Sequence, residues 1–319
     1  MAAKHVLAVD LGGTKLAMAL VNRAGKLLMR KSVGVDTSSP LAPVEQIVSM
    51  AHDLVGRKKL KAMLAAAGVA VPGLVRRDGT VWAPNLPGWT KMPLARRLKS
   101  ALGIPVLVES DRNAAVLGET WRGAARRKRD AIVLMLGTGI GAGILSGGKL
   151  IRGAHELSGC AGWMVIADGY DADARKVGQL ESMAAGPGIA RAAKKELARG
   201  IGGLLEEIPA DTINAYEVAE AARRGDVVSI EVYLEAGRLL GYAVANLVSL
   251  FDPETVVIGG GLAQASDLFL DVLRNGVKER AQPISGTKAR VVTSRLAGDA
   301  NLLGVARLAW EGDRKPYRS

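Results

Sequence analysis

Apolar residues near the start of the chain fall into three short runs that glycine and asparagine turns separate. The run from Val6 to Asp10 ends at Leu11–Gly12–Gly13, a second run covers 15–21, and Asn22–Gly25 leads into the third. Runs bounded in this way predict an antiparallel meander. After Pro40 the apolar spacing becomes helical, and residues 68–75 return to a strand pattern. This alternation of strands and helices predicts an α/β protein.

The middle of the chain contains a turn-rich loop and then repeats the opening theme. Residues 78–93 are rich in glycine and proline, so we expect a loop there, followed by a strand and then a helix that Asp111 could cap. Residues 130–153 again indicate strand, glycine turn and strand, with Gly147–Gly148 closing the hairpin. The sequence therefore predicts two α/β halves, each opened by a hairpin, that join near residues 111–129.

Helical spacing dominates the rest of the second half. It runs from residue 179 to 251, interrupted by a loop near 200–211 that is rich in glycine, aspartate and proline. A strand, a triple-glycine turn and a helix follow over 254–280, and residues 289–294 predict a late strand before a last helix at 301–310. The apolar stretch 239–251 is shorter than the roughly 20 residues that span a bilayer, so we interpret it as a buried helix.

Composition narrows the class of protein. The chain has 319 residues, 49% of them hydrophobic and 23% charged, which is typical of a globular protein of about two domains. Cys160 is the single cysteine, so a disulfide framework and a cysteine-cluster zinc site are excluded. No leader pattern precedes Asp10, and we expect a cytoplasmic protein that does not associate with membranes.

The charge balance is strongly basic, with 43 Lys and Arg against 31 Asp and Glu and a net charge of +12. A surplus of this size can indicate a polyanionic partner or a surface kept soluble by self-repulsion. The basic residues occur in scattered short clusters without the interleaved aromatic residues that stack on bases. We therefore predict a solvated surface and no nucleic-acid partner.

Three glycine turns, each after an apolar strand, are the main candidates for chemistry: residues 10–15, 137–143 and 259–261. Glycine allows a backbone to approach a phosphate closely, although any one such turn can also be purely structural. A P-loop is excluded because no glycine stands at the required spacing before Lys15. The match of Gly137, Gly139 and Ala142 to a dinucleotide fingerprint is accidental, because a hairpin follows it.

The first two glycine hairpins could clamp the phosphates of a nucleotide from two sides, with the third turn near the nucleoside. Asp10 stands at the end of the first strand, where it could hold Mg²⁺ directly or through water, or could simply form a turn.

Together the motifs resemble those of the ROK family of sugar kinases and related repressors. They are DLGGTK at 10–15, PNLPGW at 84–89, DRNAAVLGE at 111–119, LGTGIGAG at 136–143 and VIGGGL at 257–262. The resemblance covers nearly the whole chain and implies a two-domain actin-like (ribonuclease H-like) ATPase fold with an interdomain nucleotide cleft. We expect one domain over 1–115, joined by a C-terminal helix at 301–319, and a larger one over 116–300.

The resemblance also implies roles for individual residues. Asp111 would be the base that deprotonates the acceptor hydroxyl, with N-capping as its structural alternative. The nucleotide and its phosphates would be bound by Asp10, Gly12, Gly13, Thr14, Lys15, Thr138, Gly139, Gly259, Gly260 and Gly261. The sugar would be contacted by Gly73, Asn85, Ser110, Asp111, Cys160, Trp163 and Glu181. Asn85 could equally be a turn residue and Glu181 a helix-start charge.

The chain departs from the family pattern around the sugar. Many family members carry GExGH and then a cysteine-rich segment that binds zinc, but here Cys160 and Trp163 replace the Glu and the His, and no further cysteine follows. We therefore expect no zinc site. Ser110 replaces the customary Asn before the catalytic Asp, and Arg112 replaces a small residue. The adjacent His155 and Glu156 could supply substitute polar groups, and Trp163 could stack on a sugar ring or fill core space.

The leading hypothesis is a kinase that uses ATP and Mg²⁺ to phosphorylate a hexose or an amino sugar, with glucose as the default acceptor by resemblance. A sensor that binds nucleotide or sugar without efficient transfer is an alternative, and the altered sugar motif favours it. A polyphosphate-using kinase is another, suggested by the net charge of +12. A family repressor is disfavoured because DLGGTK begins at Asp10, which leaves no room for a DNA-binding module. The resemblance also implies a homodimer.

Overall fold

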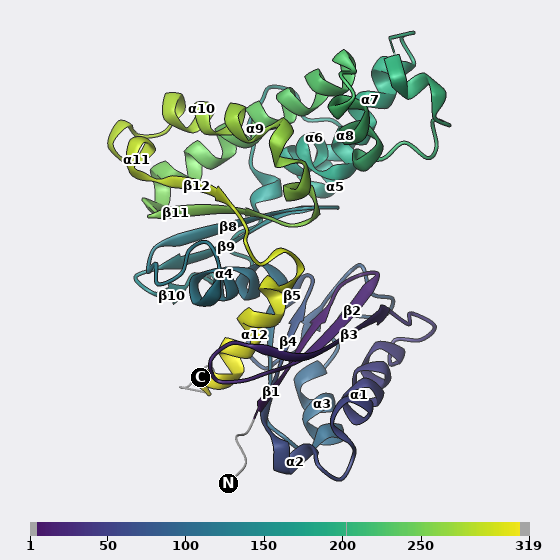
Figure 1. Ribbon diagram of the computed structural model, residues 1–319, viewed down its shortest axis with the longest axis vertical. Coiled ribbons are helices and arrows are strands. Elements are labelled where there is room, and N and C mark those ends of the chain that lie inside the picture. Colours follow the sequence, from purple (N-terminus) through teal and green to yellow (C-terminus); the bar gives the residue numbers. More distant parts are fainter. Residues whose placement is uncertain (1–4, 202, 313–319) are drawn as a thin grey trace. The chain divides into compact units, whose positions relative to one another are not determined.

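The computed structural model describes residues 5–201 and 203–312, and the protein divides into two units. Unit 1 is formed by the described residues within 1–127, 150–158 and 298–319, and unit 2 by those within 128–149 and 159–297. Figure 1 shows the helices and strands of each unit. The boundary expected between residues 115 and 116 falls inside one helix, α4 (Asp111–Arg122), all of which belongs to unit 1.

Unit 1 is built on a five-stranded sheet with the order β3-β2-β1-β4-β7. Its strands are β1 (His5–Leu11), β2 (Lys15–Val21), β3 (Leu27–Gly34), β4 (Leu64–Val71) and β7 (Val106–Ser110). The first three strands are antiparallel, as the sequence predicts, and β1, β4 and β7 are parallel. The register aligns Asp10 with Ala70 and Ala70 with Glu109. The ends of β1 and β7 therefore reach the same edge of the sheet.

Successive side chains of β1 point to opposite faces of this sheet. Leu7, Val9 and Leu11 point into an apolar core that also contains buried residues of two helices on that face. These are α1 (Ala42–Val55) and α3 (Leu94–Leu102); the short α2 (Leu60–Met63) leads into β4, and β5 (Leu74–Val75) and β6 (Val81–Trp82) form a small hairpin. Asp10 belongs to the opposite face, against which α12 (Ala300–Glu311) packs, and α4 packs on α12.

The last helix packs unusually close to its neighbours in unit 1, because glycines stand at the contacts. A Cβ atom at Gly304 would lie 1.7 Å from the carbonyl oxygen of Ala114 on α4. One at Gly68 of β4 would lie 2.1 Å from the carbonyl oxygen of Val305. Such distances are far inside van der Waals contact, so no residue with a side chain fits at these positions without moving α12.

Unit 2 contains a second five-stranded sheet, with the order β10-β9-β8-β11-β12. Its strands are β8 (Ala131–Leu136), β9 (Ile140–Ser146), β10 (Lys149–Leu150), β11 (Thr255–Gly259) and β12 (Arg290–Thr293). The antiparallel β8–β9 pair confirms the predicted second hairpin. The long helix α9 (Val227–Phe251) begins where the Asp226 carboxylate accepts a hydrogen bond from the amide of Ser229. It contains the apolar stretch predicted to be a buried helix.

The remaining elements of unit 2 are mostly short helices. The α-helices are α5 (Ala172–Val177), α6 (Gln179–Ala184), α7 (Gly186–Leu197), α8 (Ala215–Arg223), α10 (Leu270–Arg280) and α11 (Pro283–Lys288). The 3₁₀ segments are η1 (Ala161–Trp163), η2 (Gly203–Glu207), η3 (Gly261–Leu268) and, at the return to unit 1, η4 (Ala297–Asp299). The triple-glycine turn therefore leads into a 3₁₀ segment before the predicted helix begins.

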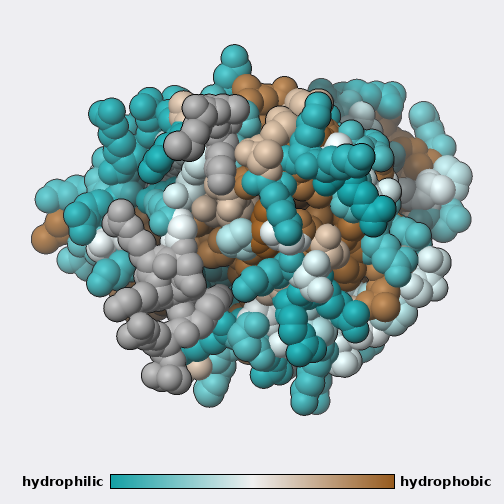
Figure 2. Space-filling model, turned by 90° about the horizontal axis from the view of Figure 1, so that it is seen from below, coloured by the Kyte–Doolittle hydropathy of each residue, from teal (hydrophilic) through white to brown (hydrophobic). Residues whose placement is uncertain are grey.

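The α/β class predicted from the sequence is confirmed by both units. Among residues 5–201 and 203–312, no helix is both long and apolar enough to cross a membrane. On the face shown in Figure 2, hydrophilic side chains are spread among apolar ones. The last helix, predicted at 301–310 from the apolar pattern and over 301–319 by resemblance, spans Ala300–Glu311, and residues 313–319 lie outside the part of the chain described.

Candidate functional site

Two aspartates define the candidate chemistry of unit 1. Asp111 is the first residue of α4, and its Oδ1 accepts a hydrogen bond from the amide of Arg112 at 2.8 Å. The helix N-cap is Ser110, so the prediction that Asp111 caps this helix was wrong by one position. The ψ angle of 147° keeps Ser110 in the extended strand and leaves Asp111 to start the helix. A carboxylate at such a junction is held by rigid elements on both sides.

The environment of both carboxylates favours their neutral forms. Burial raises the pKa of Asp111, against the opposing effect of a hydrogen bond and of the Arg112 charge. Burial also raises the pKa of Asp10 to about 6, and the negative charge of Asp111 adds to this rise. The two groups therefore interact electrostatically, as expected for strand ends on one edge of the sheet. Raised carboxyl pKa values are common at sites where a group exchanges protons.

Asn301 of α12 is a site residue that the sequence patterns did not reveal. Its side-chain amide donates a hydrogen bond to Asp10 Oδ1 at 3.1 Å. Its own Oδ1 is buried and has no hydrogen-bond partner among the described residues. Asp10 and Asn301 thus offer oxygen atoms at one place, which suits a hard cation such as Mg²⁺ with bound water. No group of three or more His, Cys, Asp or Glu side chains in residues 5–201 and 203–312 is arranged to hold a metal by itself.

The first glycine turn connects β1 to β2 in unit 1. The amide of Gly12 donates to the carbonyl oxygen of Lys15 at 2.9 Å, and Gly13, Thr14 and Lys15 are exposed. Asn85 lies beside this turn, since a Cβ atom at Gly13 would be 3.7 Å from the Asn85 Cβ. The loop of Asn85 is held by the buried indole of Trp89, which donates to the carbonyl oxygen of Pro40 at 2.8 Å. Asn85 is exposed, and the loop that carries it is anchored by Trp89.

Gly73 and Ser110 lie near Asp111 in the same unit. Gly73 has a φ of +89°, and a Cβ there would be 2.3 Å from the carbonyl oxygen of Trp82, so only glycine fits. Its carbonyl oxygen accepts a hydrogen bond from Arg112, the residue after Asp111. The hydroxyl of Ser110 is buried and has no hydrogen-bond partner among the described residues. Of the predicted sugar contacts, Gly73, Ser110 and Asp111 are thus brought together.

The second glycine turn, in unit 2, is bound by Glu181. The Glu181 carboxylate accepts a hydrogen bond from the amide of Ile140 at 2.7 Å, and burial raises the pKa of this group. A Cβ at Gly139 would lie 2.8 Å from Glu181 Oε2, so this turn and the carboxylate are in close contact. Gly162 also lies against Glu181. The structure therefore joins three predicted site regions of unit 2: residues 137–139, 160–163 and Glu181.

Cys160 and Trp163 bracket the short segment η1. Cys160 is half-buried, and its carbonyl oxygen accepts a hydrogen bond from the amide of Trp163 at 3.1 Å. The Trp163 side chain is 50% exposed, which disfavours the alternative that it fills core space. An exposed indole beside the Glu181 region offers an apolar face to a ligand.

Unit 2 contains a pocket of about 870 Å³ that is a candidate binding site. Thr138 and Gly137 of the second glycine turn and Gly261 of the third contribute to its wall, together with α7, α8 and η3. A Cβ at Gly260 would collide with the carbonyl oxygen of Leu136 at 2.2 Å, so the third turn is packed tightly against β8. The volume of the pocket lies in the range typical of sites for small molecules.

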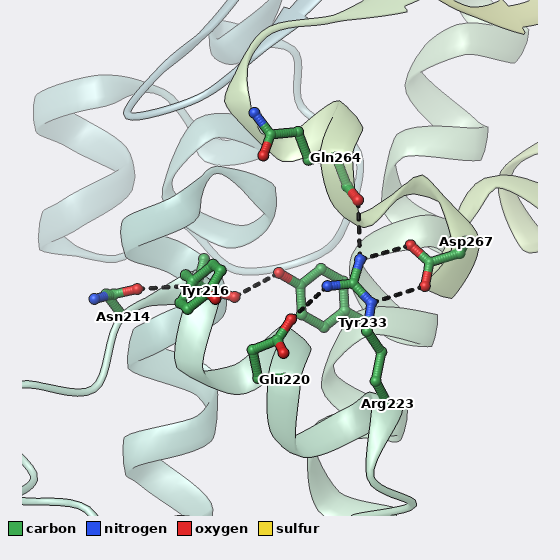
Figure 3. Close-up of polar contacts among 8 residues, drawn as sticks. Asn214, Tyr216, Glu220, Arg223, Tyr233, Gln264 and Asp267 are labelled. Carbon is green, nitrogen blue, oxygen red and sulfur yellow. Dashed lines mark hydrogen bonds and ion pairs between the residues drawn. The ribbon is translucent and has the colours of Figure 1, made fainter.

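Arg223 holds two walls of this pocket together (Figure 3). The guanidinium of Arg223, on α8, donates to both carboxylate oxygens of Asp267 on η3, at 2.8 and 3.0 Å. It also donates to the backbone carbonyl of Gln264 at 2.9 Å and pairs with Glu220. Tyr233, whose hydroxyl donates to the carbonyl oxygen of Ala215 at 2.7 Å, closes the pocket from α9. No sequence motif marked these residues.

We predict that Arg223→Ala weakens binding of a ligand in this pocket by roughly fivefold. The bridge to Asp267 is partly exposed, and such pairs contribute up to about 1 kcal/mol. Direct titration of the variant with a nucleotide measures the effect. Arg199→Ala, which removes an exposed arginine that pairs with Glu196 three residues before it, is the matched control and leaves affinity unchanged. Equal affinities of Arg223→Ala and the wild type would contradict the assigned role.

Comparisons of the sequence and of the structure with known proteins both identify the same family. A sequence model described as the ROK family matches residues 6–311. The chain is 35% identical to the glucokinase of Streptomyces coelicolor, over 96% of this chain and 98% of that protein. It is similar to the structure of a ROK family glucokinase from Streptomyces griseus in complex with glucose and AMPPNP, with a TM-score of 0.78 and 32% identity over 97% and 100% of the two chains. The ROK hexokinase of Thermus thermophilus has the same TM-score at 30% identity, over 96% of this chain and 98% of its own.

Proposed function

This chain belongs to the ROK family, and we propose on that basis that it is an ATP-dependent sugar kinase with the actin-like α/β fold of its structural neighbours. The observation that carries the proposal is the half-buried Asp111 carboxylate at the start of α4, with Gly73 and the Ser110 hydroxyl, which has no hydrogen-bond partner among the described residues, beside it. A hexose is the expected acceptor, and an amino sugar is the alternative.

The proposed reaction needs only one proton transfer from the protein. One oxygen of Asp111 is occupied by the amide of Arg112, which leaves the other to accept the proton of the acceptor hydroxyl. The hydroxyl oxygen then bonds to the γ-phosphorus of ATP while the bond from that phosphorus to the β-phosphate oxygen breaks, and ADP leaves. Phosphoryl transfer depends chiefly on positioning and on neutralising charge. Asp111 supplies the proton acceptor from a rigid strand-to-helix junction.

Each unit has groups suited to a different part of this reaction. We assign the nucleoside to the pocket of unit 2, with Thr138, Gly139 and Gly259–Gly261 as backbone contacts. Gly12, Gly13, Thr14 and Lys15 of unit 1 are proposed phosphate contacts, of which Lys15 can offset negative charge. Asp10 and Asn301 would hold Mg²⁺ through bound water, and the cation would neutralise phosphate charge. Asn85, Cys160, Trp163 and Glu181 remain proposed sugar contacts.

A transfer assay with labelled ATP tests the proposal directly. The acceptor panel contains hexoses, amino sugars and N-acyl amino sugars, and a second series replaces ATP with polyphosphate. Saturable product with one acceptor supports the kinase and identifies its substrate. Tight nucleotide binding without transfer to any acceptor would instead favour a sensor, which the replacement of polar sugar ligands by Cys160 and Trp163 suggests. Faster transfer from polyphosphate would indicate a different phosphate donor.

We predict that kcat falls on the acid side at a higher pH than an ordinary aspartate would give. The base form of Asp111 is lost as pH falls through its pKa, and burial places that pKa above the ordinary aspartate value of 3.8. The pH dependence of kcat at saturating substrates measures this limb. A limb at or below the ordinary aspartate value would contradict the assignment of Asp111 as the base.

A further inference from the structure

Residues 150–158 form a segment whose contacts differ from those of the chain around it. The flanking stretches 128–149 and 159–297 belong to unit 2, yet this segment belongs to unit 1. Two arginines of the described chain, Arg112 and Arg152, hold it to buried groups, and a third, the exposed Arg77, pairs with Glu156. The hydrogen bonds and ion pairs of these arginines lie within unit 1, and those of Arg112 and Arg152 reach residues that surround Asp111.

Arg112 makes the most extensive of these attachments. It is 8% exposed, and its Nε donates to the carbonyl oxygen of Ser158 at 3.1 Å. Its two terminal nitrogens donate to the carbonyl oxygens of Gly73, at 3.5 Å, and Glu156, at 3.4 Å. A planar guanidinium can serve three acceptors in fixed directions, which a lysine ammonium cannot. Arg112 thereby fixes the backbone of residues 156–158 and of Gly73 next to Asp111.

Arg152 attaches the start of the segment to the strand that precedes Asp111. Two of its nitrogens donate to Glu109 Oε2, at 3.1 and 2.6 Å. Glu109 is 4% exposed, and its other oxygen accepts from the amide of Ser110 at 3.0 Å and from the side chain of Asn113 at 2.9 Å. A buried carboxylate with all these partners is rigid. The segment is thus fixed on both sides of Asp111, through Glu109 before it and Arg112 after it.

The attachment changes abruptly between Ser158 and Gly159. The Ser158 carbonyl is held by Arg112, whereas the Gly159 carbonyl accepts from the amide of Ala142 on β9 at 2.7 Å. Gly159 has a φ of +82°, and a Cβ there would be 1.8 Å from the carbonyl oxygen of Ala142. Ser158 therefore belongs to unit 1 and Gly159 to unit 2, and Cys160 follows Gly159 directly in the chain.

We propose that Arg112 is a positioning residue for the acceptor, because it fixes Gly73 and residues 156–158 beside Asp111. The inference rests on the proposed function and extends it to the residue that follows Asp111 in the chain. Arg112 acts through the two backbone segments that it holds. Loss of its hydrogen bonds frees the carbonyls of Gly73, Glu156 and Ser158 to shift. The backbone segments beside the acceptor are then no longer held in the conformation that binds it.

The test compares Arg112→Ala, Arg112→Lys and the control Arg77→Ala. Arg77 pairs with the side chain of Glu156 at 3.0 Å but is 70% exposed, and such pairs contribute little. Hydrogen exchange is measured at the amides of Glu156 and Ser158, which donate within the segment to Gly153 and Arg152. We expect both amides to exchange roughly tenfold faster in Arg112→Ala, an intermediate effect in Arg112→Lys, and no change in Arg77→Ala.

Steady-state kinetics provide the second readout. We expect the KM for the acceptor to rise about tenfold in Arg112→Ala while the KM for ATP stays within twofold, because the nucleotide pocket lies in the other unit. Arg77→Ala changes neither constant. If the wild type transfers phosphate to no acceptor, the proposed function fails, and sugar binding by calorimetry replaces the KM as the measure of acceptor affinity.

Three results would overturn the inference. The first is unchanged exchange at Glu156 and Ser158 in Arg112→Ala. The second is an unchanged acceptor KM, or unchanged calorimetric affinity, despite faster exchange. The third is an equal rise of both KM values with faster exchange throughout α4, which would indicate a general structural role for Arg112.

Discussion

Replacing Asp111 with Asn is expected to lower kcat by at least about 100-fold, the effect typical of losing a general base. An amide cannot accept the proton of the acceptor hydroxyl, yet its oxygen can still accept the hydrogen bond that the amide of Arg112 donates at 2.8 Å. The variant therefore keeps the start of α4 intact. Because burial disfavours a charge at this position, the neutral Asn also carries no folding penalty from desolvation.

The measurement pairs turnover with nucleotide affinity. Direct titration with an ATP analogue should give the same affinity for Asp111→Asn and the wild type, since the pocket that we propose for the nucleoside lies in unit 2. Asp78→Asn is the matched control, because Asp78 also accepts a backbone hydrogen bond, from Thr80 at 2.9 Å, but in an exposed turn. Undiminished turnover of Asp111→Asn would remove Asp111 from the mechanism.

Gly304→Ala is expected to destabilise unit 1 by about 2 kcal/mol. Alanine favours a helix by up to about 1 kcal/mol over glycine, but overpacking costs about 1–3 kcal/mol or more. Here the added methyl would lie 1.7 Å from the carbonyl oxygen of Ala114, a backbone atom that no side-chain rotation can move. The clash therefore exceeds the helix gain, and α12 has to move away from α4.

Thermal and denaturant unfolding measure this effect, and a fall in Tm of roughly 4–8 °C corresponds to the expected loss. Gly298→Ala is the control, because the nearest atom to its added Cβ is an arginine side-chain nitrogen at an ordinary 3.7 Å. Equal stability of the Gly304→Ala variant and the wild type would show that α12 and α4 do not pack as closely as described.

Local patterns in the sequence were enough to predict most of the helices and strands. The glycine turn after Asp10 and the second hairpin at 131–146 were confirmed because each is decided by residues close together in the chain. Asp111 was predicted as a cap rather than as the first residue of α4, since a one-residue difference depends on backbone angles that the pattern does not encode.

Contacts between distant parts of the chain could not be predicted in this way. Asn301 reaches Asp10 across 291 positions, and Arg223 reaches Asp267 across 44. Neither pair shares a motif, and each residue on its own has the polar character of an ordinary surface position. The return of residues 150–158 to unit 1 was missed for the same reason, because it depends on Glu109 and Arg112 far upstream.

The arrangement of α12 also restricts the order in which the protein can form during synthesis. Unit 1 needs residues 300–311 against β4 and α4, so a ribosome must pass the whole of unit 2 before α12 can cover its face of the first sheet. Until then the face of β1 that carries Asp10 has no partner for this carboxylate from Asn301. Unit 2 can be complete earlier, since its last described residue is Ala297. The residues made first are therefore among the last to reach their final surroundings.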